Sequence, residues 1–151
     1  MSETEEEAIV LEVYERREAD RGVALITERG ELIVAHAAAA ARSRRRFGGA
    51  LQPGALIRAR WSVRREGAAP RLEEASLLRE PPKPDPLDRY YAAAHLLEVF
   101  RGIAREGAED DRLFRLLSAA LEQLGAGADL RPLLRYTEAW CLSLAGLMPE
   151  L

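Results

Sequence analysis

The sequence has 151 residues, of which 48% are hydrophobic and 31% are charged, and its formal net charge is −3. This composition is typical of a globular protein and excludes an intrinsically disordered one, and no apolar run approaches the roughly 20 residues that cross a bilayer. A single cysteine excludes an internal disulfide and a zinc site made of thiolates. The acidic N-terminus lacks the pattern of a signal or transit peptide, so we expect a cytoplasmic protein with no membrane contact.

The first eighty residues carry the pattern of a β-sheet. Five short apolar or β-branched runs are separated by turn signals, and they span residues 8–14, 22–28, 31–37, 56–64 and 71–78. The fourth run alternates apolar residues with arginines, which predicts one buried face and one basic face. A long connection separates the third run from the fourth. Five strands with this spacing predict a small closed barrel of the OB type.

A proline-rich segment, EPPKPDP at residues 80–86, follows the last strand. Its four prolines remove hydrogen-bond donors and fix φ, so neither a strand nor a helix continues through it. We therefore predict an α+β protein with a barrel domain at residues 1–80, a linker at 81–86 and a small helical domain at 87–151.

Three helices are predicted in the second half. The first starts with Asp85 as its N-cap and Pro86 at the first helical position, the second runs from about Asp110 to Leu124, and the third starts near Asp129. The apolar stripe expected on the first helix consists of Leu87, Tyr90, Tyr91, Ala94, Leu97, Phe100 and Ala104, with Leu96, Val99 and Ile103 off this stripe. The stripe expected on the third helix consists of Leu133, Leu134, Thr137, Cys141 and Leu144.

Positive charge is concentrated in and around the connection between the third and fourth strands. No acidic residue occurs from Leu32 to Arg65, and the segment ARSRRRFGGALQPG at residues 41–54 places four arginines within five positions. A segregated basic stretch in an acidic protein indicates a polyanion partner. The arginines of this stretch are Arg42, Arg44, Arg45, Arg46, Arg58, Arg60, Arg64 and Arg65.

Each part of this stretch has a second interpretation. The loop arginines either contact phosphates or form a solvated run, and Phe47 either stacks on a base or plugs the barrel. The arginines of the fourth strand either extend the polyanion-binding surface or pair with Glu73 or Glu74 of the fifth strand.

The sequence offers no catalytic constellation. His36 and His95 have no serine or cysteine partner nearby in the sequence, and Cys141 is expected to be a buried structural thiol. The acidic clusters at residues 5–7 and 109–111 are interpreted as a solvated tail and a helix start, and not as metal sites. We predict no enzymatic activity, no metal and no cofactor.

Three segments follow one another in the order and spacing of a known family. They are Glu18-Ala19-Asp20 between two strands, ARSRRRFGGALQPG after a strand ending in Val-Ala, and LLRYTEAWCLSLAGLMPEL near the C-terminus. Through them the chain resembles the RecO family of bacterial recombination-repair proteins. In that family a zinc-ribbon-like region with paired CxxC motifs follows, and this sequence has no such motifs.

The resemblance implies a function and a site. It implies a nucleoid-associated recombination mediator that binds single- and double-stranded DNA, anneals complementary strands and assists recombinase loading. The implied protein partners are RecR and the single-stranded-DNA-binding protein. The DNA-binding residues are then expected to be the eight arginines named above together with Phe47.

Two other functions are compatible with the sequence. In the family the stretch at residues 35–41 carries a glycine and additional Lys or Arg, but here it reads AHAAAAA. Together with the acidic N-terminus, this favours a protein-interaction adaptor with weak nucleic-acid binding. An RNA-binding OB module is the third hypothesis, and a binding competition would separate it from the first.

Overall fold

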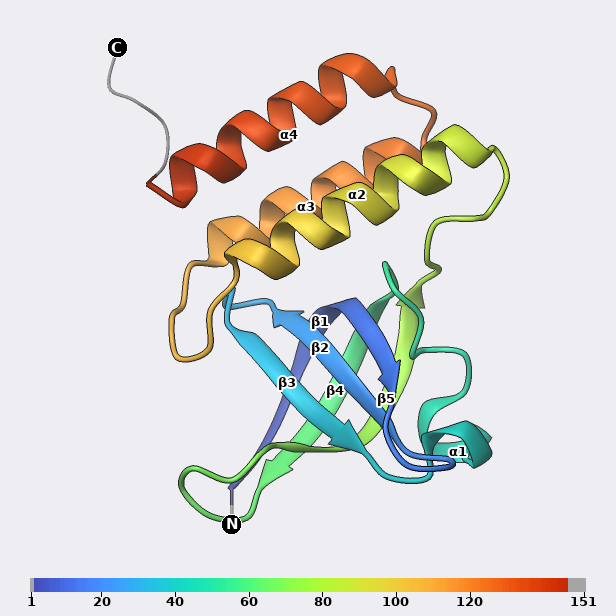
Figure 1. Ribbon diagram of the computed structural model, residues 1–151, viewed down its shortest axis with the longest axis vertical. Coiled ribbons are helices and arrows are strands. Elements are labelled where there is room, and N and C mark those ends of the chain that lie inside the picture. Colours follow the sequence, from blue (N-terminus) through green and yellow to red (C-terminus); the bar gives the residue numbers. More distant parts are fainter. Residues whose placement is uncertain (1, 147–151) are drawn as a thin grey trace.

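The computed structural model describes residues 2–146, and its first half is a closed five-stranded barrel in the order β1-β2-β3-β5-β4 (Figure 1). The strands are β1 (Ser2–Glu15), β2 (Arg21–Thr27), β3 (Leu32–Ala37), β4 (Leu56–Val63) and β5 (Arg71–Arg79). All neighbours are antiparallel except β3 and β5, which close the barrel through a parallel pairing of His36 with Arg71. The prediction of an α+β protein with an N-terminal OB barrel is confirmed.

The first strand is longer than the sequence pattern indicates. It pairs with β4 through residues 2–9 and with β2 through residues 8–15. The interpretation of residues 5–7 as a solvated tail is therefore wrong. Glu6 points inward, is only 8% exposed and forms an ion pair with Arg29, and its burial raises the pKa of its carboxyl group.

The barrel interior is filled as the alternation in β4 predicts. Ile57, Ala59 and Trp61 are buried among residues of the other strands. Phe47, from the connection between β3 and β4, is 2% exposed and belongs to the same cluster. Of the two interpretations of Phe47, the plug of the barrel is confirmed. The expectation that Phe47 is a DNA-binding residue is wrong, because a side chain buried to this extent has no ring face open to a base.

Three helices, called the helical layer below, cover one end of the barrel: α2 (Leu87–Ile103) and α3 (Asp111–Gly125) lie on it side by side, and α4 (Leu130–Leu144) packs on their far side (Figure 1). A second apolar cluster joins this layer to the barrel, with Ile9 and Ile26 from the strands packed with Phe100 and Leu117 from the helices. The contact is close, because a side chain at Gly30 would collide with the backbone of Asp110. None of the helices described is long and apolar enough to span a membrane.

The faces of α2 differ from the predicted ones. Tyr91 is 62% exposed and Leu87 is 55% exposed, whereas Leu96, which the sequence places off the stripe, is fully buried. The reason is that α2 lies on the barrel with α3 beside it and α4 on its far side, so adjacent faces are apolar and the period alone does not select the inner one. The buried set is Ala92, Ala93, Leu96, Leu97 and Phe100.

The predicted helix ends are nearly right. Pro86 and not Asp85 is the N-cap residue of α2, with no capping side chain. Asp110 caps α3 by accepting a hydrogen bond from the backbone N–H of Arg112, and α4 begins after Asp129. On α4, Thr137 and Cys141 are buried as predicted.

Candidate nucleic-acid interface

The arginine-rich connection between β3 and β4 is an ordered structure. It contains a short 3-10 helix, η1 (Ala40–Arg42), and a single helical turn, α1 (Arg44–Phe47). Ser43 separates them, and its hydroxyl accepts a hydrogen bond from the backbone N–H of Arg46 at 3.4 Å, as an N-cap does. Because Phe47 closes the turn inside the barrel, the preceding arginines are fixed at the barrel surface.

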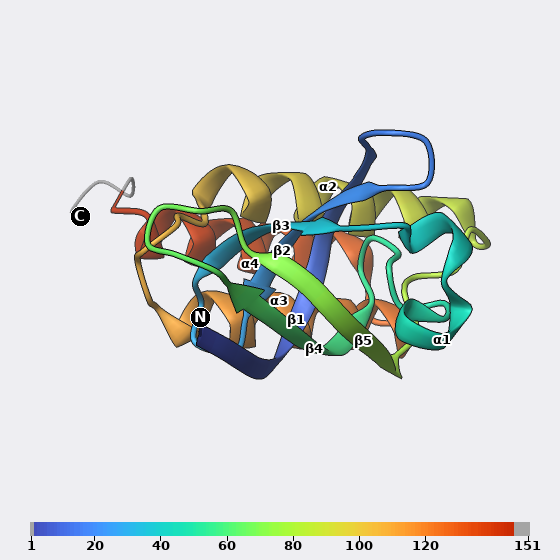
Figure 2. The same cartoon turned by 90° about the horizontal axis from the view of Figure 1, so that it is seen from below.

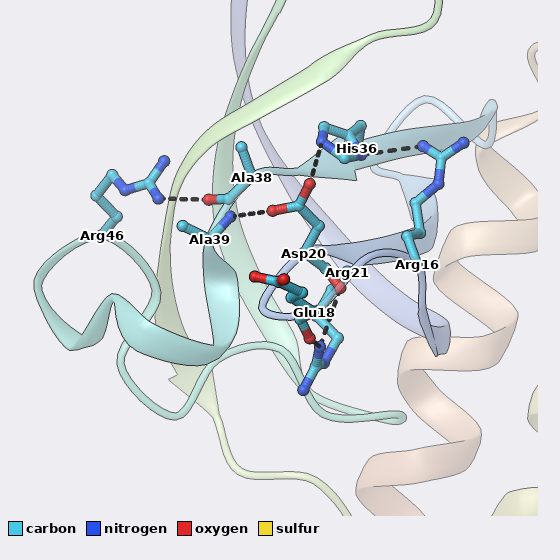
Figure 3. Close-up of polar contacts among 8 residues, drawn as sticks. All are labelled: Arg16, Glu18, Asp20, Arg21, His36, Ala38, Ala39 and Arg46. Atoms are coloured by element: carbon cyan, nitrogen blue, oxygen red, sulfur yellow. Dashed lines mark hydrogen bonds and ion pairs between the residues drawn. The ribbon is translucent and has the colours of Figure 1, made fainter.

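Asp20, in the connection between β1 and β2, holds this loop at its start (Figure 3). Its Oδ1 accepts a hydrogen bond from the backbone N–H of Ala39 at 2.8 Å, and Ala39 has a left-handed conformation with φ of 53°. The N–H of Ala39 is the main cause of the lowered pKa of the Asp20 carboxyl group. A second bond, from the N–H of Ala41 to the carbonyl of Ala19 at 2.9 Å, joins the same two segments.

His36 extends this network along β3 (Figure 3). Its Nε2 lies 3.4 Å from Oδ2 of Asp20, and its Nδ1 lies 3.0 Å from Nη1 of Arg16. A guanidinium only donates hydrogen bonds, so Nδ1 accepts, and the hydrogen on Nε2 points to the carboxylate. The loop is thus connected through Asp20 and His36 to the β1–β2 hairpin.

Arg46 belongs to the framework of the loop and does not project from it. Its guanidinium donates to the carbonyl of Ala38 (Figure 3) and, through Nε, to the hydroxyl of Ser43 at 3.1 Å. It also lies 4.8 Å from the centre of the Phe47 ring, within the range of a cation–π contact. Arg46 is half-buried, so we count it as a residue that shapes the surface.

The remaining loop arginines are exposed. Arg44 and Arg45 have no side-chain hydrogen bond or ion pair among residues 2–146. Arg42 lies 3.9 Å from a carboxylate oxygen of Glu18, and both side chains are largely exposed. An ion pair this open to water is weak, so all three guanidinium groups are accessible to a phosphate.

The arginines of β4 divide into a paired and an unpaired group. Arg60 contacts Glu3 of β1 at 2.8 Å and Glu74 of β5 at 3.3 Å, and hydrogen bonds to these two carboxylates raise its pKa. The alternative of pairing with β5 is therefore right for Arg60. Arg58 is exposed and has no such partner in the described part of the chain.

The turn after β4 adds two further charges. Arg64 and Arg65 directly follow the last residue of the strand, and both are exposed. Neither has a side-chain partner among the described residues. Glu73, the other carboxylate considered for pairing with β4, lies instead 2.8 Å from the hydroxyl of Ser62 and 3.7 Å from Nε of Arg71.

A hollow of about 160 Å³ joins the loop to the strands. It is lined by Arg45, Arg46, Arg58, Arg60, Glu5, Glu74, Ala75 and Ser76. Figure 2 shows β4 and β5 between α1 and the β4–β5 turn, and in Figure 1 the helical layer covers the other end of the barrel. We call this surface, with Arg44, Arg45, Arg58, Arg64 and Arg65, the basic face.

The described residues contain no group of three or more side chains suited to hold a metal ion. His95 pairs with Glu138 at 2.8 Å on the outer surface of the helical layer. The only thiol, Cys141, is buried, and its burial raises the pKa to about 11. The thiol of Cys141 is therefore not an activated nucleophile.

Cys141 gives a direct test of this packing. The thiolate is the reactive form of cysteine, and the Cys141 thiol is buried with a pKa of about 11. We therefore expect almost no labelling by an aromatic disulfide reagent at pH 8. Full labelling is expected in denaturant, where the pKa returns to its ordinary value. Rapid labelling of the folded protein would show that α4 does not pack as described.

The chain is similar to known proteins over nearly its full length. The family model for the N-terminal part of recombination protein O matches residues 1–81, and the model for the C-terminal part matches residues 85–151. The DNA repair protein RecO of Koribacter versatilis is 39% identical over 146 residues, which are 96% of this chain and 59% of the relative. The relative from Geobacter metallireducens is 37% identical and has the same name.

A third relative, the DNA repair protein RecO of Desulforudis audaxviator, is 36% identical over 154 aligned positions, covering all of this chain and 60% of the relative. The chain thus spans about three-fifths of the length of these curated relatives. One family model matches the barrel and the other matches the part that contains the helical layer. Both agree with the family resemblance found in the three sequence segments. The chain belongs to the RecO family.

Proposed function

We propose that this chain is a non-enzymatic DNA-binding protein of recombinational repair, and that the basic face holds the phosphate backbone of single- and double-stranded DNA. The observation that carries the proposal is the hollow in which the loop and β4, separate in sequence, bring four arginines together. Guanidinium groups bind phosphate oxygens through paired, planar donors. The names of the relatives support the same role.

The geometry favours binding without sequence preference. The exposed arginines lie on a barrel surface and in turns, and the one aromatic side chain of the loop, Phe47, is buried. Contacts to phosphates position a strand but carry no base information. Arginines that reduce the repulsion between two phosphate backbones would let complementary strands approach each other, which is the proposed physical basis of strand annealing. Assistance in recombinase loading is what the family resemblance implies.

The loop arginines provide the direct test. We expect Arg44→Ala/Arg45→Ala to weaken binding of a single-stranded oligonucleotide about 25-fold in roughly 0.1 M salt and to make the slope of log affinity against log salt shallower by about 1.4. Fluorescence anisotropy at several salt concentrations measures both quantities. Thermal stability is expected to stay unchanged, because both side chains are exposed.

A matched control removes the same charge elsewhere. Arg131→Ala/Arg135→Ala changes two exposed arginines of α4, on the helical layer, and is expected to bind the oligonucleotide like the parent. If both double variants lose affinity equally, overall charge and not the basic face controls binding. If neither variant loses affinity, the loop is a solvated surface and the proposed interface is wrong.

Protein partners form the second part of the proposal. RecR and the single-stranded-DNA-binding protein are the partners that the family resemblance implies. The helical layer offers a separate hollow of about 460 Å³, bordered by the proline-rich linker and the ends of α2 and α3. Its lining combines Pro81, Pro82 and Leu121 with side chains of both charges, Arg79 and Lys83 beside Glu80, Asp85 and Glu122, which suits an apolar peptide segment.

A further inference from the structure

The basic face contains its own carboxylates. Glu5 and Glu74 line the same hollow as the four arginines, and Glu3 holds Arg60 from the next strand. The register of β1 and β4 places Glu5 opposite Arg60 and Glu7 opposite Arg58. Glutamates of β1 therefore lie beside both arginines of β4.

The pairs on this face are of the exchangeable kind. The side chains of Glu3 and Glu74 are 52% and 59% exposed, and that of Arg60 is 31% exposed. Ion pairs open to water contribute little to stability and are screened by salt. The pair of Glu6 with Arg29 differs, because the Glu6 side chain is only 11% exposed and lies on the inner side of the strand.

We propose that Glu3 and Glu74 are specificity-determining residues that compete with nucleic-acid phosphates for Arg60, so that this arginine is released only to a multiply charged strand. The proposal rests on the proposed function of the basic face. An isolated anion reaching Arg60 must displace two carboxylates, Glu3 from β1 and Glu74 from β5, with no other contact to compensate. A strand already bound to Arg45 and Arg58 brings its next phosphate to Arg60 at a high effective concentration.

The exchange requires only a change of hydrogen-bond partners. The contacts of Arg60 with Glu3 and Glu74 break, and the two carboxylates become hydrated. The guanidinium of Arg60 then donates hydrogen bonds to phosphate oxygens. The register keeps Glu5 directly across from Arg60, so some negative charge stays in the hollow after the exchange. The bound state therefore has a lower net positive charge than the arginine count indicates.

The test removes the two competing charges without changing side-chain size. We expect Glu3→Gln/Glu74→Gln to bind a single-stranded oligonucleotide of about 20 thymidines roughly fivefold more tightly in about 0.1 M salt. The slope of log affinity against log salt is expected to become steeper by at most about 0.7, since Arg60 meets a phosphate in only a fraction of the parent complexes and in all complexes of the variant. Adding Arg60→Gln to this variant should abolish the gain.

The matched control is Glu98→Gln/Glu106→Gln. It changes the net charge by the same amount at exposed glutamates of α2 and of the segment after it, which have no side-chain partner among residues 2–146. Little change in affinity is expected, because charges more than about 10 Å from the strand are screened at this salt concentration. If the double variant at Glu3 and Glu74 unfolds, Glu74→Gln alone is measured in its place.

The outcomes separate this inference from the proposed function. A parent protein that binds the oligonucleotide while Glu3→Gln/Glu74→Gln binds no better overturns the inference and leaves the interface standing. An equal gain in the control variant, or a gain that survives Arg60→Gln, also overturns it. A parent protein with no salt-dependent binding overturns the proposed function itself.

Discussion

Replacing Phe47 with alanine is expected to lower the free energy of unfolding by about 3–5 kcal/mol, the range found when a buried aromatic side chain is truncated. Phe47 is among the largest fully buried side chains of the protein and lies within the barrel cluster. Its removal would leave a cavity beneath α1 and release the turn that carries Arg44 and Arg45. Urea denaturation of the parent and variant proteins measures the loss.

A conservative variant separates the two interpretations of this residue. Phe47→Leu keeps most of the apolar volume and is expected to lose much less stability than the alanine variant. Because the Phe47 ring is buried, the oligonucleotide affinity of the Phe47→Leu variant should match that of the parent. A variant with full stability and strongly reduced affinity would mean that the aromatic face takes part in binding, in conflict with its burial.

The second large effect is the dependence of DNA affinity on salt. Each arginine that meets a phosphate of single-stranded DNA releases about 0.7 counterion, so contacts from the five unpaired arginines of the basic face predict a slope of about −3.5. Raising the salt from about 50 to about 200 mM should then weaken binding about 100-fold. Titrations of one oligonucleotide at four or more salt concentrations measure the slope.

The size of the slope decides between the competing functions. A slope shallower than about −1.5 would mean that only one or two phosphates are engaged, and it would favour the adaptor with weak nucleic-acid binding. An equally steep slope with single-stranded RNA, and tighter binding of RNA in competition, would favour the RNA-binding module. A slope near the predicted value with equal affinity for different DNA sequences supports backbone contact.

Much of the fold was predictable from local patterns. Local signals depend on only a few neighbouring residues; examples are the alternation in β4, the prolines after β5 and the helix caps near Asp110 and Asp129. These signals placed most strand and helix ends within one or two residues of the observed ends. The division into domains at residues 80–86 stays a prediction. The inner face of α2 was not predictable, because the faces turned to the barrel and to the other helices are both apolar.

The candidate site was predictable only in part. The sequence identifies the arginines but not which of them are already engaged. Arg60 is held by Glu3, which lies 57 positions away in the sequence, and Arg46 is held by the carbonyl of Ala38. Contacts of this kind depend on strand register and loop geometry, which a single sequence does not contain. The stretch at residues 2–7 gave no strand signal, because Glu5, Glu6 and Glu7 follow one another and no apolar residue alternates with them.

The hydrogen bonds that the N–H groups of Ala39 and Ala41 donate to Asp20 and Ala19 have a consequence for the energetics of binding. A basic segment that is disordered when free must lose backbone entropy of roughly 1–2 kcal/mol per residue as it becomes ordered on a ligand. Here that entropy is lost during folding, when the connection between β1 and β2 forms hydrogen bonds with the loop. The loop that carries the arginines is therefore already ordered before the ligand binds. Less of the free energy of each arginine contact is lost to ordering the backbone, and binding is correspondingly tighter.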